Sequence, residues 1–306
     1  MFIRFAATRF LQALPVLLIA SLVAFAVLPA PDTAGQGRGA SGLLPERYAQ
    51  FVIGAVQGDF GLSVAAGKPV GVLLGASLPA TVTLITLALV ISLAVGVPAG
   101  LAAAAARRHR AGSVIAAFAN LAGLLPPLAT GALVWPALAG GVATGKITTA
   151  DNGGFLPIPA DGTVPVIVPA LLVGLFLSAP LIRLLRDGMG RAMESGFIRF
   201  AWARGLPRYF VFRHAIANAL VPVATSATAQ LAALIAISAV AEAVFHRPGA
   251  GLMLFNAVAA RDWAVLSAML LLASLTFTCT SVASDLVSYA LDPRTRPART
   301  VLRTAR

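Results

Sequence analysis

Long stretches without a charged side chain dominate the pattern of hydrophobic and polar positions along the chain. Six runs contain no Asp, Glu, Lys or Arg, and they cover residues 10–31, 69–106, 111–145, 162–182, 214–241 and 263–284. Each run reaches the roughly 20 residues that a helix needs to cross a hydrocarbon core about 30 Å thick. Backbone groups inside lipid need partners within the same segment, so runs of this length favour helices.

The runs therefore predict an all-α, polytopic membrane protein, with six transmembrane helices in a single transmembrane domain that covers residues 1–306. The expected helices lie at about 10–30, 79–106, 112–143, 163–186, 218–244 and 263–291. Pro126 and Pro127 should kink or break the third helix, because proline removes a helical hydrogen bond. Residues 187–217 form the expected cytoplasmic loop between the fourth and fifth helices.

Composition agrees with this class. Hydrophobic residues make up 58% of the chain and charged residues 11%, whereas a soluble domain has about a quarter charged residues. The short alternating segments of a transmembrane barrel are absent from the sequence.

Basic residues predict the orientation in the membrane. With the N-terminus in the cytoplasm, seventeen Lys and Arg residues fall inside and six outside, which follows the positive-inside rule. Both termini are therefore expected in the cytoplasm of a bacterial cell, with the chain in the inner membrane. The net charge of +12 then reflects topology and contact with anionic lipid headgroups, and no nucleic-acid partner is expected.

Candidate chemistry is sparse. No nucleophile–base–acid set and no paired carboxylates stand out, so the chain is not expected to be an enzyme, and neither a cofactor nor a metal site is predicted. Residues 140–148 approach a phosphate-binding loop, but Ile147 replaces the Ser or Thr that would bind magnesium. Glu242 and Asp285 lie near helix ends without a partner in their own span, which disfavours an ion relay and hence a secondary transporter. Cys279 is expected to be a small packing residue.

Small residues at four-residue spacing, such as Gly96 and Gly100, or Gly71 and Gly75, predict close packing of helices.

The loop at 187–217 has its own pattern. Met189, Met193, Phe197, Phe200 and Ala201 fall on one face of a single expected helix, with Arg199 on the other side. Gly205 is a natural helix stop, and Leu206 and Pro207 restart the chain as a second helix. Periodicity alone leaves two interpretations open: an amphipathic helix resting on anionic headgroups, or a docking element for a cytoplasmic partner.

At this loop the sequence resembles the permease subunits of ABC importers of the dipeptide, oligopeptide and nickel type. The family's cytoplasmic "EAA---G" loop matches "FIRFAWARGL" at 197–206 and "RHAIANALVPV" at 213–223. Further likeness lies in "GDFGLS", "LPATVTLITLAL", "LIRLLRDGM", "VFHRPGAGLMLFNAVAARDW" and "YALDPRTR", which together span nearly the whole chain. Phe200 and Trp202 depart from the family loop, which has a small and a basic residue there.

The resemblance implies a type I permease that forms half of a translocation pathway for short peptides or similar small solutes. Its implied partners are a second, different permease subunit, two cytoplasmic ATPase subunits and an extracytoplasmic solute-binding protein. It also implies that the loop helix docks in an ATPase groove, through Phe197, Arg199, Phe200, Ala201, Ala203, Arg204, Gly205 and Leu206. Nickel, glutathione and glycosides are alternative substrates within this branch, and a stand-alone secondary transporter or a membrane scaffold is the alternative from another class.

Overall fold

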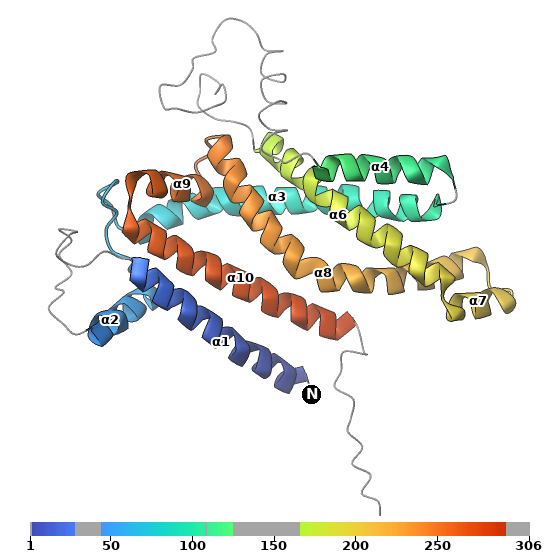
Figure 1. Ribbon diagram of the computed structural model, residues 1–306, viewed down its shortest axis with the longest axis horizontal. Helices are drawn as coiled ribbons and strands as arrows, with labels where there is room; N and C mark the ends of the chain where they lie inside the picture. The colour runs from blue at the N-terminus through green and yellow to red at the C-terminus, as the bar shows by residue number, and fades with distance from the viewer. Residues whose placement is uncertain (1, 28–43, 108, 125–165, 292–306) are drawn as a thin grey trace, which may run out of the picture.

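The computed structural model of the chain describes residues 2–27, 44–107, 109–124 and 166–291 (Figure 1). Nine α helices account for most of these residues. They are α1 (Phe2–Val27), α2 (Leu44–Val56), α3 (Val70–Ala105), α4 (Arg110–Leu124), α6 (Ile167–Glu194), α7 (Gly196–Ala203), α8 (Arg208–Val244), α9 (Ala250–Ala260) and α10 (Trp263–Leu291). In this part of the chain, β pairing is limited to an isolated bridge between Leu62 and Pro69.

Four segments are long and apolar enough to cross a membrane: Ala7–Ala26, Val70–Ala105, Ile167–Glu194 and Trp263–Val287. Shorter apolar stretches lie in α4, α8 and α9. The all-α, polytopic class is therefore confirmed. The third expected span begins as α4, but its residues 125–143, and the loop at 140–148, lie outside the described residues.

Four expected helix bounds are wrong, and the first is the start of α1, which lies at Phe2 and not at about residue 10. α3 begins at Val70, so Pro79 lies inside the helix. Val70 and Leu74 are buried against α9 and α10, and this packing keeps the turns before the proline helical. α6 continues to Glu194 and α8 begins at Arg208, because the extended ends of both helices pack on each other through Met189, Ala192, Val211, Ala215 and Ala219.

The core lies where α3, α6 and α8 meet, with Ala88, Val173 and Leu234 buried at the contact. Glycines allow α3 and α6 to approach closely. A Cβ atom at Gly96 would lie 2.7 Å from Leu181 Cδ2, and one at Gly100 would lie 2.8 Å from Leu185 Cβ. The expected packing role of this pair is confirmed, whereas Gly75 has no neighbour within 4 Å of its missing side chain.

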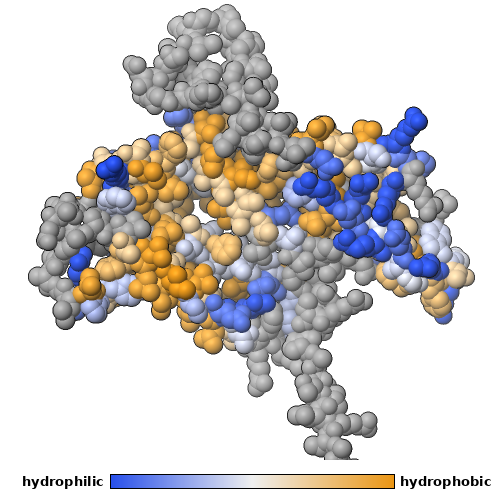
Figure 2. Space-filling model, viewed as in Figure 1, coloured by the Kyte–Doolittle hydropathy of each residue, from blue (hydrophilic) through white to orange (hydrophobic). Residues whose placement is uncertain are grey.

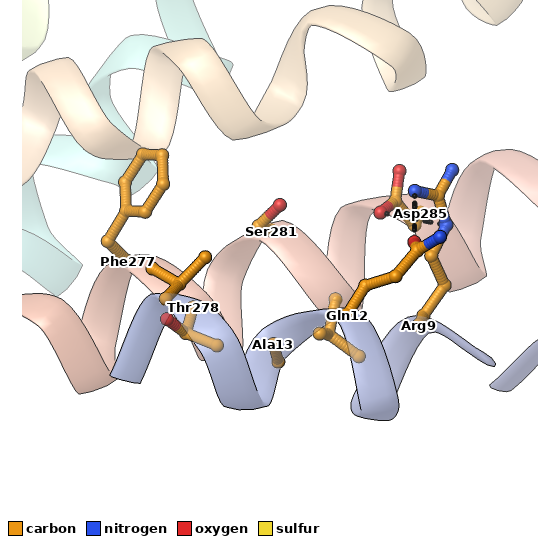
Figure 3. A pocket seen from close by; sticks show the side chains of 9 residues that line it. Arg9, Gln12, Ala13, Phe277, Thr278, Ser281 and Asp285 are labelled. Atoms are coloured by element: carbon orange, nitrogen blue, oxygen red, sulfur yellow. Dashed lines mark hydrogen bonds and ion pairs between the residues drawn. The ribbon is translucent and has the colours of Figure 1, made fainter. Parts of the chain in front are cut away.

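Helix α1 packs along α10 on the other side of the molecule (Figure 1). Arg9 and Asp285 form an ion pair between the two helices, beside a pocket that Gln12, Thr278 and Ser281 also line (Figure 3). Asp285 thus takes its partner from another helix. Cys279 is exposed on α10, so its expected packing role is wrong; the neighbouring Thr278 is the residue that turns inward.

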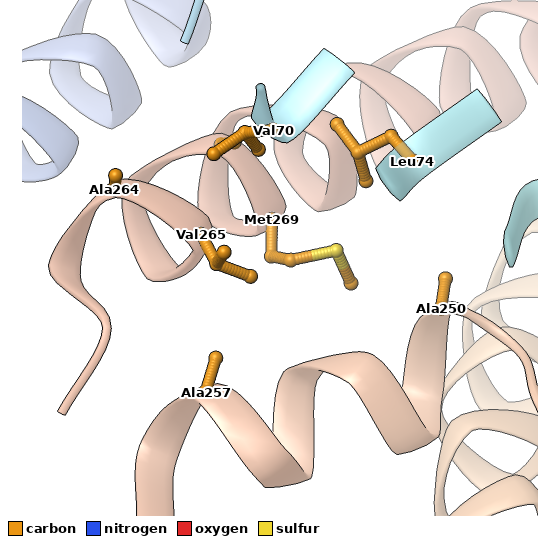
Figure 4. Packing of buried hydrophobic residues seen from close by; sticks show 8 residues of the cluster. Val70, Leu74, Ala250, Ala257, Ala264, Val265 and Met269 are labelled. Atoms are coloured by element: carbon orange, nitrogen blue, oxygen red, sulfur yellow. The ribbon is translucent and has the colours of Figure 1, made fainter. Parts of the chain in front are cut away.

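The end of the molecule opposite α7 is built from the start of α3, helix α9 and the start of α10 (Figures 1 and 4). Val70, Leu74, Ala250, Val265 and Met269 form one buried cluster there. We call this end the α9 end, and the opposite one the α7 end.

Candidate functional site

Helix α7 is a separate short helix between α6 and α8. The break before it lies at Ser195, whose backbone is extended, with φ −70° and ψ 151°. The Ser195 hydroxyl donates a hydrogen bond back to the Ala192 carbonyl, and the Arg199 guanidinium donates to the Glu194 carbonyl over 3.1 Å. The Arg199 bond satisfies a carbonyl group that the end of α6 leaves without a helical partner, whereas the Ala192 carbonyl also accepts from the Ser195 N–H.

The end of α7 has the geometry that its sequence predicts. Gly205 has φ +71°, its N–H donates to the Trp202 carbonyl (2.9 Å), and the Leu206 N–H donates to the Ala201 carbonyl (3.2 Å). This pair of bonds is a Schellman motif, in which a residue of left-handed conformation closes the helix. Pro207 follows as the residue before the first turn of α8, so the expected stop and restart are confirmed.

Ile198 is the buried residue of α7 that packs against the body of the protein. Its side chain is 1% exposed and packs among Met189 of α6 and Val211 and Ala215 of α8. Sequence reasoning missed Ile198 because it treated 189–201 as one helix. The break at Ser195 resets the helical phase, so Met189 and Met193 belong to α6, and the inward face of α7 is formed by Ile198 and the half-buried Ala201.

The other predicted site residues are brought together on the outer surface of α7. Phe197 is 45% exposed, Phe200 60% and Leu206 41%. Arg199, Ala203, Arg204 and Gly205 are exposed as well. The expectation that Phe197 and Phe200 share a face with the two methionines is therefore wrong, and these aromatic side chains point away from the protein.

Two arginines shape the surroundings of α7. The Arg204 guanidinium lies over the Phe200 ring at 4.6 Å from its centroid, a cation–π contact that holds the exposed ring in place. Arg107 forms an ion pair with Glu194 over 3.4 Å, and its guanidinium lies against the bare backbone of Gly190, where any Cβ would clash. Hydrophilic side chains gather at this end of the molecule, while apolar side chains dominate the opposite part of the visible face (Figure 2).

Known proteins resemble this chain over most of its length. A family model for the binding-protein-dependent transport system inner membrane component matches residues 96–297. The glutathione transport system permease protein GsiC of Escherichia coli (strain K12) is 29% identical over 254 residues, which are 83% of this chain and 80% of that protein. The GsiC proteins of Shigella dysenteriae serotype 1 and E. coli O6:H1 are 29% and 28% identical over the same shares.

The family match covers about two thirds of the chain and includes α6, α7, α8, α9 and α10. The all-helical polytopic fold agrees with it. The chain therefore belongs to the family of binding-protein-dependent transport system inner membrane components and is a permease subunit of an ABC importer.

Proposed function

We propose that this permease forms half of the translocation pathway for short peptides, including glutathione, and that α7 couples it to a cytoplasmic ATPase. The permease is itself a non-catalytic component, and ATP hydrolysis belongs to separate ATPase subunits. A second permease chain completes the pathway, and a solute-binding protein delivers the substrate from the other side of the membrane.

The position of α7 beyond the membrane carries the coupling proposal. Arg183 is the first charged residue of α6, and the helix continues for eleven further positions to Glu194, which adds about 16 Å at 1.5 Å per residue. Even a helix tilted by about 40° would project about 12 Å. The headgroup layer is only about 5–8 Å thick on each side. With Arg183 at the edge of the hydrocarbon core, this length supports a position of α7 beyond the headgroups, in water.

Aromatic side chains that are exposed to water favour contact with a protein over contact with lipid. Phe197, Phe200 and Trp202 are each more than 40% exposed, although α7 is only eight residues long. An amphipathic helix of this kind fits a groove on another protein. This favours docking to an ATPase over the alternative of an interfacial helix on headgroups.

Charge supports a cytoplasmic location for the α7 end. Arg183 and Arg191 of α6 and Arg199 of α7 lie there, together with Arg107 in the turn after α3. Arg9 lies on the half of α1 that faces the same way (Figure 1). An excess of basic residues favours the cytoplasmic side. We therefore place both termini in the cytoplasm and α9 on the outer side.

The substrate proposal rests on the relatives. The proteins that match this chain are glutathione transport permeases, and glutathione is a short peptide. Uptake of labelled glutathione, dipeptides, nickel ions and a glycoside should be compared in cells with and without the gene. Peptide or glutathione uptake that depends on the gene is expected. Uptake of nickel or the glycoside alone would contradict the proposal that the substrate is a short peptide.

The coupling role is tested with Gly205→Pro in the reconstituted complex. The variant cannot adopt φ +71°, because proline fixes φ near −65°, so α7 should lose its closing turn. Substrate-stimulated ATPase activity should be lost while membrane insertion is kept. Gly196→Ala is the matched control, because nothing lies within 4 Å of its added Cβ. Normal stimulation of the Gly205→Pro complex would rule out the coupling role.

A further inference from the structure

Helix α9 is held at its first turn by a buried carboxylate from α8. Glu242 has no exposed surface, and its Oε2 accepts a hydrogen bond from the Gly251 N–H over 2.7 Å. A Cβ atom at Gly249 would clash with both carboxylate oxygens, so the backbone of this turn lies directly against the acid. An acceptor oxygen at a helix N-terminus is favourable because the first N–H groups lack helical partners.

Helix α3 contributes to the same turn. The Thr81 hydroxyl accepts a hydrogen bond from the Ala250 N–H over 2.8 Å, and the backbone of Gly251 lies against that of Ala239 in α8. The first two N–H groups of α9 therefore donate hydrogen bonds to side chains of α3 and α8.

A second buried carboxylate fixes the other end of α9. Asp262, 1% exposed, lies between α9 and α10. Its Oδ1 accepts from the Val265 N–H (3.4 Å), and its Oδ2 accepts from the Ser63 hydroxyl (2.5 Å) and the Ala65 N–H (3.3 Å). Through Asp262, α9 is tied to α10 and to the loop that precedes α3.

Helix α8 connects this arrangement to α7. It runs from Arg208 to Val244, 37 residues, or roughly 55 Å along its axis, and it bends near its middle (Figure 1). Its first turns share the buried cluster of Ile198, through Val211 and Ala215, and Glu242 lies in its last turn. One helix therefore contacts α7 at one end of the molecule and holds α9 at the other.

We propose that Glu242 is a positioning residue that makes α9 move with α8, so that displacement of α7 changes the outer surface formed by α9 and the Ser63 loop. This inference rests on the proposed coupling role of α7. Two distant sites are coupled when both change the position of a shared element. In this proposal α8 is the shared element, and Glu242 attaches it to α9.

The test follows α9 directly in the assembled importer. A cysteine introduced by Val258→Cys, in a Cys279→Ser background, lies on the exposed face of α9 and reports its surroundings through the rate of maleimide labelling. The rate is measured with and without ATP plus vanadate, which traps the ATPase subunits. Trapping should change the rate by at least about fivefold, within the usual range of allosteric coupling.

Glu242→Ala should reduce the change in labelling rate on trapping to below about twofold, while basal ATP hydrolysis and complex assembly persist. Glu242→Gln should keep most of the change, since its amide oxygen can still accept from Gly251. Ser238→Ala is the matched control: Ser238 is fully buried one turn earlier on α8, and its hydroxyl has no hydrogen-bond partner among the described residues. Its response should equal that of the native chain.

A full labelling response in Glu242→Ala, or no response in the native complex, would overturn the inference. If Glu242→Ala does not assemble, Glu242→Met, which keeps a side chain of similar length without an acceptor oxygen, replaces it; a reduced response supports the inference and a native one overturns it. Co-purification of the ATPase with the permease distinguishes a failure of the proposed function from a failure of the proposed role of Glu242. ATPase binding that is insensitive to changes in α7 refutes the proposed function, whereas binding through α7 without a response at Val258 refutes only the role of Glu242.

Discussion

Arg9 of α1 and Asp285 of α10 form an ion pair, with Arg9 Nε 3.3 Å from Asp285 Oδ2. The two residues are separated by most of the chain, yet their helices run side by side (Figures 1 and 3). Arg9 also donates to the Gln12 side chain over 3.2 Å. Because α1 otherwise presents mainly apolar side chains outward, this polar contact sets the register of α1 on α10.

We expect Asp285→Asn to weaken the packing of α1 on α10. The side chains are 39% and 33% exposed, so solvent screening limits the interaction to about 1 kcal/mol or less. A double-mutant cycle of Arg9→Gln and Asp285→Asn, read from the thermal stability of the purified permease, should give a positive coupling of that size. The exchange Arg9→Asp with Asp285→Arg should restore part of the stability. Strict additivity of the two single changes would show that the pair contributes nothing.

Two glycines of α3 should respond oppositely to alanine. At Gly100, a Cβ would lie 2.8 Å from Leu185 Cβ and 3.2 Å from the Ile182 backbone, so Gly100→Ala must push α6 away and should cost about 1–3 kcal/mol. Gly75→Ala meets nothing within 4 Å and should stabilise the helix by up to about 1 kcal/mol. Unfolding of the purified permease in a denaturing detergent series measures both. Equal effects at the two sites would contradict the close α3–α6 contact.

These cases show which features of the fold could be read from the sequence. Apolar runs identified the membrane class because their length is a local property, and Gly205 identified a helix end because only glycine readily adopts its φ. The Gly96 and Gly100 pair was recognisable from spacing alone, although its partner helix was not.

Other features depended on contacts between distant residues. The start of α3 at Val70 depends on packing against α9 and α10, which outweighs the preference for proline at a helix start. The inward position of Ile198 depends on the break at Ser195, and a shift in helix phase changes which side chains face inward. The partners of Glu242 and Asp285 come from other parts of the chain, so no pattern within one span could reveal them.

Arg261 offers a stabilising substitution at the end of α9. It adopts the left-handed conformation, with φ 55° and ψ 39°, and its side chain is exposed. Glycine has no Cβ to oppose this conformation, so Arg261→Gly should be more stable than Arg261→Ala by about 1 kcal/mol. Thermal stability of the two variants is the measurement, and the reverse order would mean that the left-handed turn is not maintained.

The final prediction separates the two faces of α7. Ile198→Ala removes a fully buried side chain from the cluster with Met189 and Val211, so the isolated permease should lose about 2–4 kcal/mol of stability. Phe200→Ala removes a ring that is 60% exposed, so the stability of the isolated permease should change by less than about 0.5 kcal/mol.

The same two variants should have the opposite order of effects on the affinity for the ATPase subunits. If the outer face of α7 docks, Phe200→Ala should weaken ATPase binding by at least about tenfold, as expected for a buried aromatic contact in an interface. Ile198→Ala should weaken it only through the loosened attachment of α7, and added lipid or lower temperature, which stabilise the permease, should restore it. Titration of the ATPase against each permease in nanodiscs gives both affinities. Native affinity in Phe200→Ala would contradict docking through this face, because the exposed ring would then have no role in the complex.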